Sequence, residues 1–210
     1  MPRYNSVFLQ LPTYPQQVLE RKKSEVLQKG IVLYDFGVGD PQERVPEFIP
    51  EALQKAVQGH FGYPSIVGDP IFRQTVADYV KRRFHVNLNP DQQILPCSGS
   101  KEAVFHAPLL VIDPNAEDRT VLFPDPGYPA YCRGALFAGG EPVPVPLTGD
   151  FVFRPWELPE GVLKKTRLLW LNTPHNPSGA VTPLADLQRI ADLCRQYDIL
   201  CISDECYADI

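Results

Sequence analysis

Apolar residues recur at helical spacing in the first part of the chain. A helix is predicted to begin at Pro70, because Asp69 is a favourable N-cap and proline is favoured in the first helical turn. Five apolar residues would share one face of this helix: Phe72, Val76, Tyr79, Val80 and Phe84. A shorter helical pattern covers residues 46–58, and residues 35–41 resemble a short strand that runs into a glycine turn.

From residue 94 onward the pattern predicts strands and helices that alternate. Strands are expected over residues 94–97, 120–123, 167–171 and 199–202. Helices are expected from about residue 101, over residues 129–137, and after Thr182-Pro183. Pro108 falls inside the first of these helices and should kink it or end it early. Alternation of this kind favours an α/β fold, in which helices cover a parallel sheet.

One predicted strand carries a proline at every second position. The prolines are Pro142, Pro144 and Pro146, within residues 141–147. Alternate N–H groups of a strand point to the same side, so the three missing donors lie along one edge. A central strand does not tolerate this loss, but an edge strand does. We therefore expect this segment at the border of the sheet.

Composition excludes several classes of protein. The chain has 210 residues, of which 44% are hydrophobic and 21% charged, and its formal net charge is −5. These values exclude intrinsic disorder and leave no basic footprint for nucleic acid. The apolar runs are too short to cross a membrane, and the first residues lack the pattern of a signal peptide. We therefore expect a cytoplasmic globular protein.

The cysteines and histidines do not indicate a metal site or a disulfide framework. The five cysteines are an odd number with no C-x-x-C spacing, so reduced thiols are expected. The four histidines stand singly along the chain. Neither set has the spacing of a zinc site.

Four loops with polar or aromatic residues follow the predicted strands. They are residues 98–101, 125–129, 172–179 and 203–207. In open α/β sheets, ligands bind at the carboxyl ends of the strands. Taken singly, each loop is also compatible with a structural role: a helix cap, a turn, an ordinary loop or a surface ion pair. Together they offer a phosphate cradle, an aromatic platform, an amide, and an aspartate with a tyrosine three residues later.

This combination resembles the fold-type I pyridoxal-phosphate-dependent aminotransferases, and most closely the LL-diaminopimelate aminotransferase group. The resemblance covers essentially the whole chain. It implies the three-layer large domain of that fold with a mostly parallel sheet, incomplete here, and an N-terminal arm with a small-domain segment. The stretches that carry it are Phe8–Tyr14, Gly37–Pro41, Tyr63–Gly68, Gly99–Glu102, Pro124–Pro129 and Asn176–Gly179.

The resemblance implies contacts to the ring of the cofactor, pyridoxal 5'-phosphate. Asp204 would pair with the ring nitrogen and keep it protonated. Tyr207 and Asn176 would hydrogen-bond the phenolic oxygen, and Tyr128 would stack on the ring face. His175, within the same loop as Asn176, is interpreted as structural.

The resemblance also implies contacts to the phosphate group. The backbone of Gly99, with Ser100 and Lys101, would hold the phosphate. Tyr63 would reach the phosphate of a neighbouring subunit, which implies a homodimer.

Two residues would contact the substrates, which are an amino acid and a 2-oxo acid. Gly39 would offer backbone contact to a substrate carboxylate, and Tyr14 would border the distal end of a long substrate.

The residue that carries the chemistry in this family has no counterpart in the chain. The family forms a Schiff base between the cofactor and a lysine beyond the Asp-x-x-Tyr loop, whereas this sequence ends at Ile210. We therefore expect an arm and small-domain segment over residues 1–44 and a truncated cofactor-binding domain over residues 45–210. The 210-residue chain is expected to be inactive alone. The alternatives are another amino-acid aminotransferase, a β-lyase, or a non-catalytic remnant of the fold.

Overall fold

The structure is a computed structural model that describes residues 3–37, 39, 43–57, 59 and 62–209. The chain divides into two compact units, which are described separately below. One unit covers Pro12–Pro96, and the other combines Met1–Leu11 with Cys97–Ile210. The boundary expected between residues 44 and 45 remains a prediction.

Three helices lie in the described part of residues 12–96. They are α2 (Pro15–Gln28), α3 (Phe48–Ala56) and α4 (Pro70–Phe84). Helix α4 begins as predicted, because the Asp69 carboxylate accepts the N–H of Ile71 at 2.7 Å. Helix α3 lies within the predicted range, whereas α2 was not predicted.

The prediction of a short strand within residues 35–41 is wrong for the residues of that range that the structure describes. The Asp35 carboxylate turns back to accept the N–H of Gly37 at 2.8 Å and forms an ion pair with Lys23 at 2.8 Å. Phe36 is 94% exposed. Since none of the described strands pairs with this segment, its backbone stays irregular.

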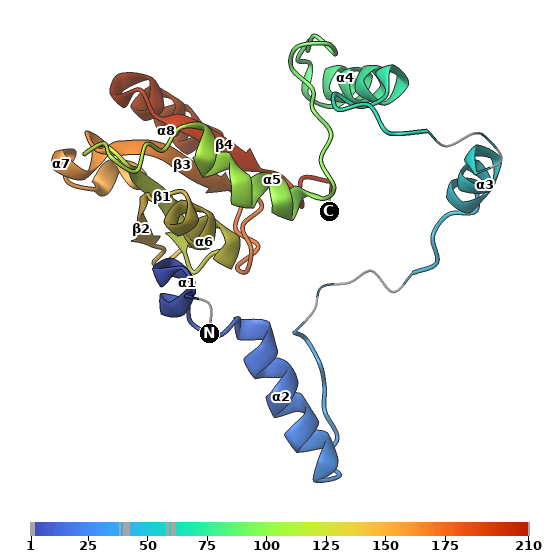
Figure 1. Cartoon of the computed structure of the whole chain (residues 1–210), viewed down its shortest axis with the longest axis horizontal. Helices are drawn as coiled ribbons and strands as arrows, with labels where there is room; N and C mark the ends of the chain where they lie inside the picture. The colour runs from blue at the N-terminus through green and yellow to red at the C-terminus, as the bar shows by residue number, and fades with distance from the viewer. Residues whose placement is uncertain (1–2, 38, 40–42, 58, 60–61, 210) are drawn as a thin grey trace. The chain divides into compact units, whose positions relative to one another are not determined.

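The other unit is built on a four-stranded sheet (Figure 1). Its strands are β1 (Thr120–Asp125), β2 (Glu141–Pro146), β3 (Thr166–Asn172) and β4 (Leu200–Asp204). Their order is β2-β1-β3-β4, and every neighbouring pair is parallel. The predicted α/β class with a parallel sheet is confirmed.

Strand β2 lies at one border of the sheet, as its prolines predicted. The N–H groups of Glu141 and Leu147 donate toward β1, to the carbonyls of Arg119 at 2.9 Å and Asp125 at 2.8 Å. With the two-residue repeat of a strand, the intervening prolines face away from β1. The missing donors therefore cost the sheet no hydrogen bond.

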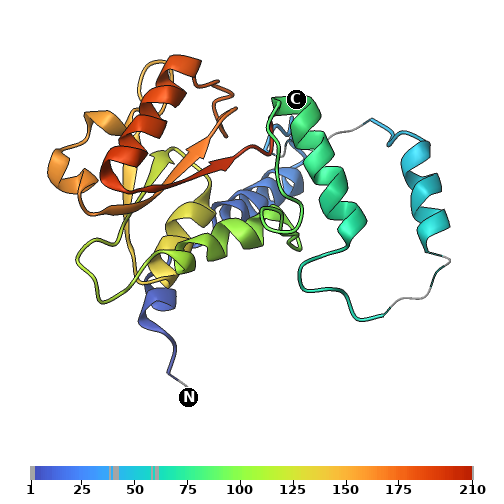
Figure 2. The same cartoon turned by 90° about the horizontal axis from the view of Figure 1, so that it is seen from above.

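Helices cover both faces of the sheet (Figure 2). Alternate residues of β3 enter two cores: Leu168 and Trp170 face one side, and Leu169 and Leu171 face the other. The first side packs against α5 (Ser100–His106), the 3-10 helix η1 (Ala107–Leu110) and α6 (Pro129–Phe137). The second packs against η2 (Pro155–Glu157), α7 (Glu160–Leu163) and α8 (Leu184–Tyr197). The short helix α1 (Ser6–Gln10) completes this unit.

Residues 94–97 do not form the strand that was predicted there. Leu95 is 74% exposed, Pro96 has no N–H to donate, and none of the described strands pairs with the segment. The helix expected after it does form and ends early. Helix α5 stops at His106, and Pro108 lies in η1. No helix in the described part of the chain is long and apolar enough to cross a membrane.

Candidate functional site

A cavity of about 210 Å³ opens at the carboxyl ends of the strands. Six of the predicted cofactor-binding residues line it: Ser100, Lys101, Tyr128, Asn176, Asp204 and Tyr207. Three of the segments that carry them follow β1, follow β3 or end β4, whereas residues 98–101 lead into α5. Val104, Tyr131, Asn172 and Cys206 complete the lining.

Asp204 places a carboxylate on the cavity wall at the end of β4. Its Oδ2 accepts a hydrogen bond from the hydroxyl of Tyr131 at 2.7 Å, and its Oδ1 accepts the N–H of Cys206 at 3.4 Å. Tyr131 is fully buried in α6. Burial and the adjacent Asp204 charge both raise the pKa of Tyr131, so its hydroxyl keeps the proton that it donates.

Asn172 ties the end of β4 to the loop that carries Asn176. Its Nδ2 donates to the backbone carbonyl of Asp204 at 2.9 Å, and its Oδ1 accepts the N–H of Asn176 at 2.7 Å. The side chain is only 5% exposed. Neither Asn172 nor Tyr131 was predicted from the sequence as a site residue. For Asn172 a signal existed, because a buried polar residue at the end of an apolar strand needs hydrogen-bond partners.

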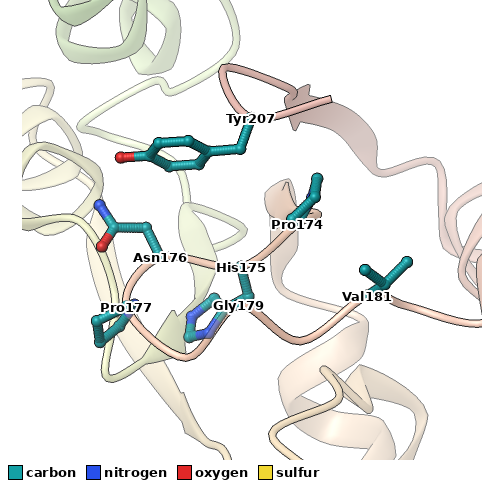
Figure 3. A pocket seen from close by; sticks show the side chains of 7 residues that line it. All are labelled: Pro174, His175, Asn176, Pro177, Gly179, Val181 and Tyr207. Atoms are coloured by element: carbon teal, nitrogen blue, oxygen red, sulfur yellow. The ribbon is translucent and has the colours of Figure 1, made fainter. Parts of the chain in front are cut away.

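The loop after β3 presents Asn176 beside Tyr207 (Figure 3). A second cavity of about 370 Å³ adjoins this pair and is lined mainly by the loop itself. His175 anchors the loop: its Nε2 donates to the carbonyl of Pro126 at 2.9 Å, and its Nδ1 lies 2.7 Å from the hydroxyl of Ser178. Burial lowers the pKa of His175, which favours the neutral ring that accepts the Ser178 proton. These contacts agree with the structural role expected for His175.

Tyr128 reaches the cavity from a turn that requires glycine. A side chain at Gly127 would place its Cβ against the carbonyl oxygen of Pro124, too close for any contact, so only glycine fits the turn. The Tyr128 ring meets the ring of Tyr131 edge-on at 5.8 Å. The ammonium group of Lys101 lies 5.9 Å from the centre of the Tyr128 ring.

Ser100 and Lys101 are the first two residues of α5 and are both exposed. Gly99, which directly precedes them, has φ of 102°, a conformation that side chains disfavour. Of the described residues that line the cavity, Lys101 is the only lysine. This side of the cavity therefore combines a hydroxyl group with a positive charge, as an anion requires.

Three predicted site residues belong to the other unit. Tyr14 is the half-buried N-cap of α2, Gly39 is exposed, and Tyr63 is 98% exposed. These residues are described within that unit alone, and their predicted contacts stay predictions.

Residues 31–210 match the family model of aminotransferase class I and II. The chain is 41% identical over 204 residues to an LL-diaminopimelate aminotransferase of Aquifex aeolicus, and 37% identical to one of Desulforudis audaxviator. These alignments cover 95% of this chain and 52% and 51% of the two relatives. The chain therefore spans about half the length of the curated relatives it matches.

Solved structures of aminotransferases share the fold. An aminotransferase from Neisseria meningitidis matches with a TM-score of 0.88 and 31% identity, over 99% of this chain and 53% of its own. An aspartate aminotransferase double mutant from Thermus thermophilus matches with a TM-score of 0.87 and 28% identity, over 99% of this chain and 54% of its own. The family model, the sequence relatives and the shared fold agree: the chain belongs to the class I and II aminotransferases.

Proposed function

We propose that the chain forms the pyridoxal-phosphate-binding part of an aminotransferase that moves an amino group between LL-diaminopimelate and 2-oxoglutarate, a reaction of lysine biosynthesis. The class I and II family is pyridoxal-phosphate-dependent, and the sequence relatives described above support this substrate. One observation carries the cofactor assignment. A single cavity gathers a carboxylate, an amide, two tyrosine rings, a hydroxyl group and a lysine from four separate loops.

The donor set around the cavity fits this cofactor. The Asp204 carboxylate would hold a protonated ring nitrogen, while Asn176 and Tyr207 would donate to the phenolic oxygen. Tyr128 would cover one face of the ring. When bound, the cofactor supplies an electron sink for the substrate carbanion. The buried contacts of Tyr131 and Asn172 keep Asp204 and Asn176 in place for these roles.

The opposite end of the cavity would hold the phosphate. Lys101 supplies the positive charge, Ser100 a hydroxyl group and Gly99 an unobstructed backbone. This assignment agrees with the chemistry of the cavity, in which the cation lies on the α5 side and the carboxylate at the end of β4.

The remaining assignments concern the substrate and a second subunit. We propose that Tyr63 contacts the phosphate in a neighbouring subunit of a homodimer, consistent with a side chain that its own unit leaves 98% exposed. Gly39 would meet a substrate carboxylate through its backbone, and Tyr14 would border the distal end of the substrate.

Cofactor binding is tested with pyridoxine 5'-phosphate, which lacks the aldehyde and so does not react with lysines. Calorimetric titration of the 210-residue chain should detect binding at one site. Lys101→Gln should weaken it about tenfold, since a charge-assisted contact to phosphate is lost. Lys165→Gln changes an exposed lysine away from the cavity and should leave the affinity unchanged. Absence of binding, or equal effects of the two variants, would contradict the assignment.

The substrate assignment is tested on the product of the whole reading frame, including any coding sequence after the codon for Ile210. We expect LL-diaminopimelate and 2-oxoglutarate to yield glutamate. Release of pyruvate from a substrate with a leaving group on its β-carbon would instead indicate a β-lyase. We expect no glutamate from the 210-residue chain alone, and turnover by that purified chain would contradict this expectation.

A further inference from the structure

Tyr131 carries a hydroxyl group in a place where a phenylalanine ring would also fill the space. Its ring is fully buried and stacks on Trp170, with 4.8 Å between the ring centroids and an interplanar angle of 19°. Tyr128 meets it edge-on from the cavity side. Because these contacts fix the ring, they also fix the position of the hydroxyl group.

That hydroxyl group donates to one oxygen of the Asp204 carboxylate, Oδ2, at 2.7 Å. The other oxygen, Oδ1, accepts the longer hydrogen bond from the N–H of Cys206 at 3.4 Å. A carboxylate oxygen has room for two hydrogen bonds. Asp204 can therefore accept a further hydrogen bond on the cavity wall while the hydroxyl group of Tyr131 fixes the position of Oδ2.

We propose that Tyr131 is a positioning residue: it orients the Asp204 carboxylate toward a protonated ring nitrogen in the cavity. The inference rests on the proposed function, because that nitrogen belongs to the cofactor. A hydrogen bond between two charged groups is strong when its geometry is fixed. Without the hydroxyl group, the half-buried carboxylate turns more freely and the contact to the ring nitrogen weakens.

The test compares two ligands that differ only at the ring nitrogen. They are pyridoxine 5'-phosphate and its carbon analogue, in which a C–H group replaces the nitrogen. Calorimetric titration measures the affinity of each ligand for the 210-residue chain and for Tyr131→Phe. We expect the substitution to lower the affinity for pyridoxine 5'-phosphate about tenfold, which is the effect of losing one hydrogen bond to a charged group. The affinity for the carbon analogue should change less than twofold.

Tyr197→Phe is the matched control. Tyr197 ends α8, which packs on the opposite face of the sheet, and it does not line the cavity. It should leave both affinities unchanged. Equal losses for the two ligands in Tyr131→Phe would show that Tyr131 acts only through packing, and would overturn the inference while leaving cofactor binding intact. If the unmodified chain binds neither ligand, the proposed function fails and the inference fails with it.

A second comparison keeps the proposal testable if Tyr131→Phe alone does not fold. The double variant Tyr131→Phe/Asp204→Asn removes the phenol and the charge together, which avoids a half-buried carboxylate with a missing donor. If Tyr131 acts through the carboxylate, this double variant should bind pyridoxine 5'-phosphate within about twofold of Asp204→Asn alone. A further tenfold loss in the double variant would overturn the inference.

Discussion

Gly134 allows α6 to lie against α5, and replacing it with alanine should disturb both the fold and the proposed cofactor site. The residue is buried in α6. An added Cβ would lie 2.5 Å from the carbonyl oxygen of Phe105 in α5, and 3.2 Å from the carbonyl carbon and Cα of that residue. These atoms belong to backbone, so no side chain can rotate away. One helix has to shift.

Two opposing effects determine how much stability Gly134→Ala loses. Alanine favours a helix over glycine by about 1 kcal/mol, whereas overpacking of a well-packed core costs about 1–3 kcal/mol and occasionally more. Because the contact is with backbone, we expect the upper part of that range and a net destabilisation of about 1–2 kcal/mol. A shift of α5 would also displace Ser100 and Lys101, so the affinity for pyridoxine 5'-phosphate should fall.

Gly161→Ala is the matched control, since Gly161 lies in α7 and a Cβ there would meet no atom within 4 Å. Urea unfolding followed by tryptophan fluorescence measures both variants. We expect the free energy of unfolding of Gly161→Ala to be unchanged or raised by up to about 1 kcal/mol. Its affinity for pyridoxine 5'-phosphate should equal that of the unmodified chain. A Gly134→Ala chain as stable as the Gly161→Ala chain would refute the reasoning.

Three further predictions concern the thiols, a helix cap and the core. Burial and the Asp204 charge raise the pKa of Cys206 to about 11, so its alkylation by iodoacetamide should rise about tenfold per pH unit from pH 8 to 10. The hydrogen bond from the Cys194 thiol lowers the pKa of Cys201, so Cys201 should be alkylated faster than Cys206 at pH 8. Peptide mass spectrometry measures the alkylation rates of the two cysteines, and equal rates at pH 8 would contradict these pKa directions. Asp69→Ala removes the N-cap of α4 and should reduce helicity, measured by circular dichroism, with a loss of about 1 kcal/mol in stability. Leu169→Ala should lower the free energy of unfolding by about 3 kcal/mol, because the side chain is fully buried, whereas Leu184→Ala at an 81% exposed position should change it little.

Local signals were sufficient for most elements of the sheet unit. Helix α6 has the predicted bounds because Pro129 favours the first turn and Gly139, with φ of 79°, permits the chain to leave the helix. The centre of β3, residues 168–171, is a continuous apolar run, as a strand covered on both faces requires. The prolines of β2 even specified its place in the sheet.

Elements that depend on distant partners, or on none, were harder to predict. Residues 94–97 have the composition of a strand, but a strand also needs a neighbour for its backbone, and none of the described strands supplies one. Helix α2 was not predicted. Its described residues are all exposed or half-buried, and it is supported locally by Pro15 and by ion pairs such as Lys23–Glu20.

The candidate site shows the same division. Asp204 and Asn176 could be identified from their loops, since chemistry-bearing residues follow strand ends. The hydrogen bond between Tyr131 and Asp204 joins residues 73 positions apart, and no local pattern records it. The sheet topology creates that contact, so only the folded chain reveals it.

The prolines of β2 also determine which border of the sheet can pair with a strand of another molecule. Along the outer border of β2, Pro142, Pro144 and Pro146 offer carbonyl groups but no N–H group. A strand from another molecule would find acceptors there and nothing to donate to its own carbonyls, so pairing on this side is blocked. In the described sheet, β4 forms the opposite border and has no proline among its residues. Any self-association by strand addition should therefore use β4, and it should end at two molecules joined β4 to β4, because neither copy then has another border that can pair.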